Sequence, residues 1–161
     1  MTIMGFVQCV CAFFACIGFG FLFNVRGRMI VTTALGGALG WLTDVVMASF
    51  IVSDIPRYFA ATLVISIYAE VMARVDKVPV IVYLIIALLP LVPGSGMYYT
   101  MDYWLNGDEV AFVTTGSHTI MIAGALALGV VLVSSLVRLW KIMRRQRRWR
   151  LLHPQENTPE K

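Results

Sequence analysis

Five apolar stretches separated by short polar connections constrain the fold of this chain more than any other feature. They run over residues 3–23, 29–52, 58–75, 78–90 and 110–137. A helix of about 20 residues, rising about 1.5 Å per residue, crosses the roughly 30 Å hydrocarbon core of a bilayer. In lipid the backbone must satisfy its own hydrogen bonds, as a helix does. The sequence therefore predicts an all-α integral membrane protein with five transmembrane helices.

The composition excludes the main alternatives to a membrane protein. Of 161 residues, 59% are hydrophobic and 14% are charged, whereas a soluble domain carries roughly 25% charged residues. Three cysteines do not make a disulfide framework, and a chain this apolar does not stay disordered. We divide the chain into a five-helix transmembrane domain, residues 1–143, and a basic cytoplasmic tail, residues 144–161. This leaves no room for a soluble catalytic domain.

The basic residues predict the orientation of the chain in the membrane. Twelve of the thirteen Lys and Arg residues fall on alternate connections that share one side, and only Arg57 falls on the other. The positive-inside rule then places the N-terminus outside and the C-terminus in the cytoplasm, which requires an odd number of spans. The Arg-rich tail is expected to bind anionic lipid headgroups rather than nucleic acid.

The fourth stretch is interrupted by Pro90, Pro93, Gly94 and Gly96. Proline removes a backbone donor and clashes with the preceding turn, so we expect the transmembrane helix to break there. A second half-helix starting near Ser95 would present free N–H groups and a positive dipole end. Transporters hold carboxylates at such ends. The alternative is a proline kink that only ends a helix at the membrane surface.

Asp44 lies within the second apolar stretch and is a candidate proton-coupling or substrate-coupling group. At helical spacing it falls on one arc with Gly37 and Gly40, beside Gly36. Such small residues let another helix approach closely, so we expect a helix-packing face here. A carboxylate on that face would lie against protein or water rather than lipid. Alternatively, Asp44 is an ordinary acid near the outer membrane surface.

Glu70 and His118 are the other two candidates for proton coupling. Glu70 shares a face with Ser66 and lies toward the cytoplasmic end of the third stretch, where it would act as a proton relay. Alternatively, it forms an i,i+4 ion pair with Arg74. His118 lies near the outer start of the fifth stretch, where a histidine can respond to the proton gradient. The alternative is a hydrogen-bonded histidine at the interface.

Neither a metal site nor an enzymatic site is expected. Cys9, Cys11 and Cys16 lie in the first stretch without a histidine or an acid at ligand spacing, so we expect no metal and no cofactor. Ser117 and His118 are adjacent on a helix and point apart. Because no other Ser–His pair is positioned for catalysis, an intramembrane hydrolase is disfavoured.

Several segments together resemble the threonine/serine exporter family. They are residues 17–24 (IGFGFLFN), 34–40 (ALGGALG), Ala73-Arg74 ahead of Pro79, and 89–99 (LPLVPGSGMYY). The resemblance runs from about residue 5 to 140 and is to the small subunit that corresponds to the C-terminal half of full-length exporters. The Pro-Leu-Val-Pro-Gly block with its following tyrosine is the most specific element.

The resemblance implies a proton-driven secondary exporter of small hydrophilic metabolites, either threonine and serine or small dicarboxylates. It also implies a second membrane subunit of about five spans and a multi-pass location in the cell inner membrane. Pro90, Pro93, Gly94 and Tyr98 carry over as an element of the substrate pathway, with Ser95 and Gly96 between them. The rival hypothesis is a non-transporting scaffold or assembly factor docked through the tail. Deleting residues 144–161 would inactivate a scaffold but leave an exporter mostly active.

Overall fold

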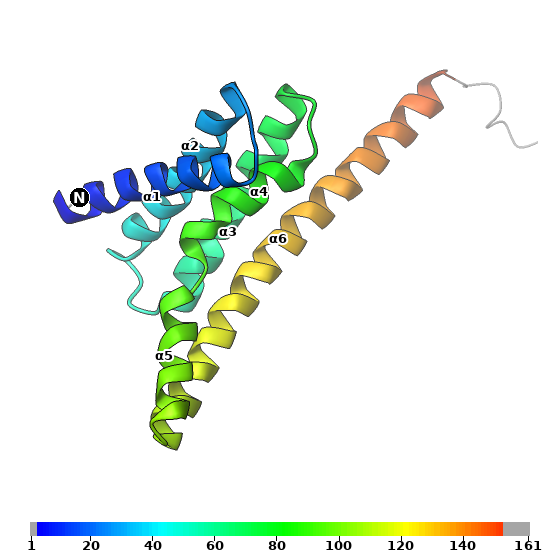
Figure 1. Ribbon diagram of the computed structural model, residues 1–161. Coiled ribbons are helices and arrows are strands. Elements are labelled where there is room, and N and C mark those ends of the chain that lie inside the picture. Colours follow the sequence, from blue (N-terminus) through cyan, green and yellow to red (C-terminus); the bar gives the residue numbers. More distant parts are fainter. Residues whose placement is uncertain (1–2, 153–161) are drawn as a thin grey trace, which may run out of the picture.

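The computed structural model describes residues 3–152, which form six α-helices and one short 3-10 helix (Figure 1). No strand occurs among these residues, so the predicted all-α class is confirmed. The helices are α1 (Ile3–Leu22), α2 (Arg28–Met47), α3 (Asp54–Val75), α4 (Val80–Leu88), η1 (Leu89–Leu91), α5 (Gly94–Leu105) and α6 (Glu109–Leu152).

Four of the described helices, α1, α2, α3 and α6, are long and apolar enough to cross a membrane. A fifth crossing is obtained if Val80–Leu91 and Gly94–Leu105 count as one span, and these two segments meet at an angle of 53°. The helix is therefore broken at the Pro/Gly motif, as the sequence predicts. These helices make the chain a multi-pass membrane protein.

Three helix boundaries differ from the apolar stretches. Helix α2 ends at Met47, so the apolar residues 48–52 lie in the connection to α3. Helix α3 begins at Asp54, four residues earlier than expected, because Pro56 is compatible with a first helical turn. Helix α6 continues through the basic segment to Leu152, past the boundary at 143/144 that we drew between domain and tail. Arginine is a good helix former, so charge alone does not end the helix.

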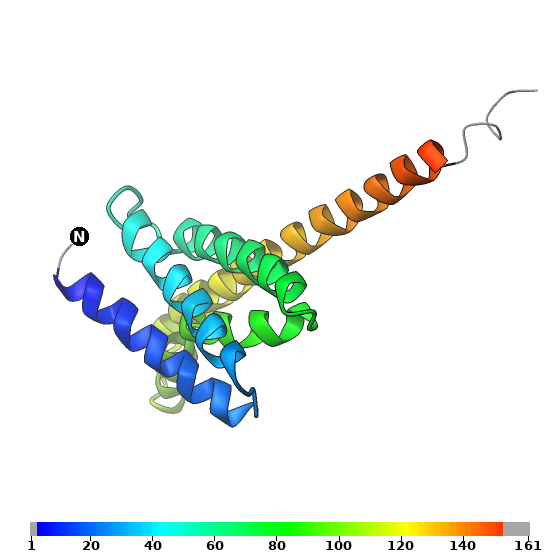
Figure 2. The same ribbon diagram turned by 90° about the horizontal axis from the view of Figure 1, so that it is seen from above.

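Helix α2 is the centre of a compact group and packs against α1, α3 and α4 (Figure 2). Gly36, Gly37 and Gly40 are buried on it. A methyl group at Gly36 would lie 2.9 Å from the Tyr68 ring, and one at Gly37 would collide with the thiol of Cys16. The absent side chains thus allow both α1 and α3 to approach α2 closely.

Helix α5 is less buried than this group, whereas α6 packs along α3. Helix α5 packs chiefly against α6, and none of its residues is buried. The contact between the two helices depends on small residues, because a methyl group at Gly116 would lie 3.1 Å from Thr100 and one at Gly96 would collide with Thr119. Figure 1 shows α5 and the first turns of α6 extending below the other helices. One face of α5 is therefore left to lipid or to another protein.

The turns fall at two ends of the molecule. The α1–α2 turn, the α3–α4 turn and the C-terminal part of α6 lie toward the top of Figure 1, whereas the α2–α3 loop and the α5–α6 turn lie lower. We call the first end the basic end and the other the opposite end. The described cationic side chains of these segments are Arg26, Arg28, Arg74, Lys77, Arg138, Lys141 and Arg144.

Candidate functional site

The break between α4 and α5 combines a 3-10 turn with an extended residue. Pro90 lies within η1, and Pro93 directly precedes the first residue of α5. Gly94 and Ser95 are exposed, while Gly96 is half-buried against Thr119. The Gly94 amide donates to the carbonyl of Val92 at 2.7 Å. The next amides belong to the first turn of α5, where a helix offers them no acceptor of its own.

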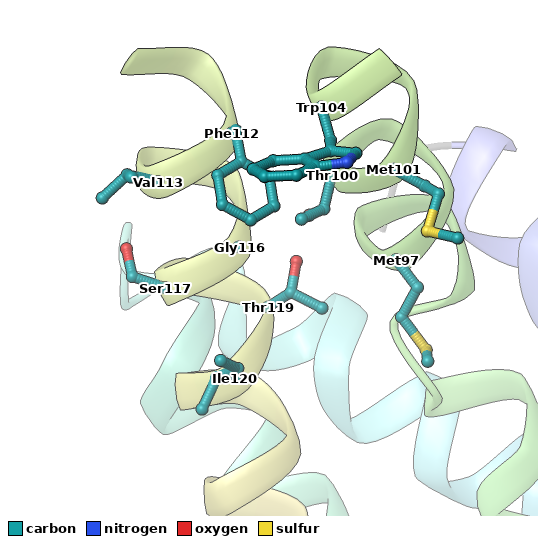
Figure 3. A pocket seen from close by; sticks show the side chains of 10 residues that line it. All are labelled: Met97, Thr100, Met101, Trp104, Phe112, Val113, Gly116, Ser117, Thr119 and Ile120. Atoms are coloured by element: carbon teal, nitrogen blue, oxygen red, sulfur yellow. The ribbon is translucent and has the colours of Figure 1, made fainter. Parts of the chain in front are cut away.

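The aromatic and methionine side chains that follow the break form an apolar groove between α5 and α6 (Figure 3). The groove encloses about 700 Å³, and Trp104 packs across it against Phe112 with ring centroids 5.0 Å apart. Thr100 and Thr119 donate their hydroxyls to backbone carbonyls of their own helices. These groups are already satisfied, so the groove has little capacity to bind a polar ligand. Tyr98 lies on the exposed surface of α5.

A charged cluster joins three helices at the opposite end. Asp44 on α2 is buried. The Arg57 guanidinium on α3 donates two hydrogen bonds to its carboxylate, from Nε to Oδ1 at 3.1 Å and from Nη2 to Oδ2 at 2.8 Å. Arg57 Nη1 also donates to Asp54 Oδ1 at 3.0 Å. His118 Nε2 on α6 lies 4.0 Å from Asp54 Oδ2. Two of the three predicted proton-coupling residues therefore belong to one cluster, linked through Arg57.

Glu70 forms a second charged cluster at the basic end. Its side chain is mostly buried on α3, and its Oε2 faces Arg74 Nη2 at 3.4 Å and Lys141 Nζ at 3.5 Å. The i,i+4 pair with Arg74 is thus present, but Lys141 reaches the same oxygen from α6. The Arg74 guanidinium also lies over the ring of Trp140, 5.6 Å from its centroid. Cavities open on both sides of Glu70.

Polar side chains follow one face of α3 from Glu70 toward the middle of the molecule. Ser66 and Thr62 lie one and two turns before Glu70 and are completely buried. A methyl group at Gly129 of α6 would lie 2.9 Å from Thr62, so this face packs against α6. Thr62 donates to a backbone carbonyl, but the Ser66 hydroxyl has no partner among the described residues. A buried hydroxyl without a hydrogen-bond partner is uncommon in folded proteins.

Two basic residues that complete the clusters, Arg57 and Lys141, are not identifiable as site residues from the sequence, which shows them only as positive charges that orient the chain. Arg57 follows Asp54 by three residues, a spacing that favours a local ion pair, but its bonds to Asp44 depend on how α2 and α3 pack. Lys141 lies 71 positions after Glu70, and no local spacing connects them.

Comparison with known proteins gives one significant result. Residues 8–136 match the family model described as Threonine/Serine exporter, ThrE. The match includes the Pro/Gly break, Asp44, Glu70 and His118, but it ends before Arg138 and Lys141. Neither the curated proteins nor the solved structures gave a significant match.

Proposed function

This chain belongs to the threonine/serine exporter family, and from that membership we propose that it is one subunit of a proton-coupled secondary exporter. The exported molecules are small hydrophilic metabolites, either threonine and serine or small dicarboxylates. The chain works with a second membrane subunit of about five spans in the cell inner membrane. The observation that carries this proposal is the family match over 129 residues, 8–136, which covers nearly all of the apolar helices.

The distribution of charge supports a five-span arrangement with the basic end in the cytoplasm. The α1–α2 turn, the α3–α4 turn and the C-terminal part of α6 all lie at that end, and each carries basic residues. With α4 and α5 as one broken span, the N-terminus lies outside and α6 enters the cytoplasm. The basic residues beyond position 143 then lie beside anionic headgroups of the inner leaflet.

The surface of the chain supports a partner subunit. A polar metabolite needs a polar path through the hydrocarbon, and this chain offers few polar side chains within its spans. Large apolar side chains are exposed on α1, among them Phe6, Phe14 and Phe21, and on the outer face of α5. We assign part of this surface to the second subunit and the remainder to lipid.

The two charged clusters supply groups for a transport cycle. Arg57 on α3 lies 13 residues before Glu70, a separation of about 20 Å along the helix. In the proposed mechanism, the first-turn amides of α5 receive a substrate carboxylate, and Asp44, Glu70 or His118 takes and releases the coupling proton. The buried indole N–H of Trp41 has no partner among the described residues, and its ring packs on the core cluster that contains Leu91, next to the break. This donor adds a further polar group to the path.

The test is efflux of labelled threonine, serine and succinate from cells that express the chain with and without its partner. Replacing both Asp44 and Glu70 with the corresponding amides should abolish acceleration of efflux by a proton gradient. Asp102→Asn, on the exposed α5–α6 hairpin, is the matched control and should leave the acceleration unchanged. If the double variant retains proton-dependent export at the wild-type rate, neither acid couples protons.

A further inference from the structure

A polar cavity lies beside Glu70, between α3 and α6 at the basic end. It encloses about 350 Å³, within the range of small-molecule sites. Its polar lining combines one acid with two cations and two hydroxyls, which are the side chains of Glu70, Arg138, Lys141, Ser134 and Ser135. A cavity lined in this way is complementary to a ligand that carries both signs of charge.

The ion pairs at this cavity leave binding capacity unused. Arg74 and Lys141 approach the same oxygen of Glu70, at 3.4 and 3.5 Å, whereas a charge-assisted hydrogen bond is typically about 2.7–2.9 Å long. The other carboxylate oxygen of Glu70 makes no hydrogen bond to any described residue. Arg138 pairs with no acid in the described part of the chain.

We propose that this cavity binds a free α-amino acid before its export. The substrate carboxylate contacts Arg138 and Lys141, its ammonium contacts Glu70, and the serine hydroxyls lie beside its polar side chain. The assignment rests on the proposed function for the orientation of the site, because the basic end then faces the cytoplasm, where an exporter collects its substrate. The family match ends before the two cations, so membership of the family does not assign this site.

The acid in the cavity decides between ligand classes. A dicarboxylate or a phosphate would place its second negative charge close to Glu70, and like charges at short range oppose each other. An ammonium group at the same place completes an ion pair. Arg138 and Lys141 attract the carboxylate of either ligand, so the preference for a zwitterion rests on the group that the ligand places against Glu70.

The experiment measures binding and transport separately, in inverted membrane vesicles from cells that carry the full chain in its native gene context. Binding of labelled L-threonine is measured in de-energised vesicles, with succinate as the comparison ligand. Glu70→Gln and Lys141→Gln should each raise the half-saturating threonine concentration about tenfold, the typical loss for a charged hydrogen bond. Glu70→Gln should not weaken succinate binding. Lys77→Gln, an exposed cation at the same end outside this cavity, should change nothing.

Thermal unfolding of each variant, together with rescue by Lys141→Arg, separates lost binding from lost folding. The proposed binding site would be overturned if Lys141→Gln and Arg138→Gln bound threonine with the wild-type affinity. It would also be overturned if the wild type bound succinate more strongly than threonine. Absence of threonine binding in wild-type vesicles would overturn it too. Proton-driven threonine uptake in energised vesicles tests the proposed exporter function. Wild-type vesicles that bind threonine but do not take it up would contradict the proposed function. Uptake by the variants at the wild-type half-saturating threonine concentration would contradict only the binding site.

Discussion

The two charged clusters differ in how completely their charges are paired. At the opposite end, the Arg57 guanidinium engages both oxygens of Asp44 at 2.8 and 3.1 Å. At the basic end, Lys141 and Arg74 share one oxygen of Glu70 at 3.4–3.5 Å, beside open cavities. The first arrangement is suited to holding α2 and α3 together. The second leaves room and charge for a ligand.

The difference follows from the chemistry of the cations. A guanidinium is a planar fork that matches a carboxylate in two places, so the Arg57–Asp44 pair has a fixed geometry. The Lys141 ammonium is a point charge on a flexible stem, and its side chain is 55% exposed. An ion pair with that much exposure contributes little to folding. We therefore expect the opposite-end cluster to matter most for stability and the basic-end cluster most for transport.

The largest expected effect is from Arg57→Ala, which removes the partner of a buried acid. An uncompensated buried charge is expensive, and we expect a loss of about 3 kcal/mol in the free energy of unfolding. Thermal unfolding in detergent micelles, compared with Arg26→Ala at the exposed α1–α2 turn, measures it. A loss no larger than that of the control would show that this cluster does not hold α2 and α3 together.

A middle-sized effect is expected where α3 and α6 meet between the clusters. Gly129→Val would force a side chain against Thr62, and overpacking of this kind costs about 2 kcal/mol. Gly124→Val is the matched control on the same helix, since a Cβ atom there has no heavy atom within 4 Å. Equal melting temperatures for the two variants would contradict the close α3–α6 contact.

The smallest expected effect on stability is from Glu70→Gln. Its partners are substantially exposed, so the free energy of unfolding should fall by less than about 1 kcal/mol. In the efflux assay, loss of acceleration by a proton gradient in this single variant would identify Glu70, rather than Asp44 or His118, as the coupling group. A stability loss as large as that of Arg57→Ala would remove the contrast between the clusters.

Much of the fold follows from local sequence properties. The apolar runs identify the helices, and Pro90 and Pro93 identify the break, because proline affects its own turn wherever it lies. Helical periodicity also places Gly37, Gly40 and Asp44 on one face, and all three are buried. The end of α2 is not predictable in this way, since residues 48–52 are as apolar as the helix before them.

Local sequence spacing predicts only some of the ion pairs in the two charged clusters. Local spacing finds Glu70 with Arg74, because the two residues lie four apart on one helix. It does not find Glu70 with Lys141, or His118 near Asp54, because these pairs depend on how α6 crosses α3. A single sequence contains no signal for that crossing. The proton-coupling roles of Asp44, Glu70 and His118 remain predictions.

Helix α6 is long enough for a small change in its tilt to move its far end by a large distance. Its 44 residues make an unbroken rod about 66 Å long, roughly twice the thickness of the hydrocarbon core. The rod carries His118 near one end and Lys141 near the other, so any change in its inclination moves both. A rotation of about 10° about the α5–α6 turn would sweep its far tip through about 11 Å, which converts a small rearrangement on one side of the bilayer into a large displacement on the other.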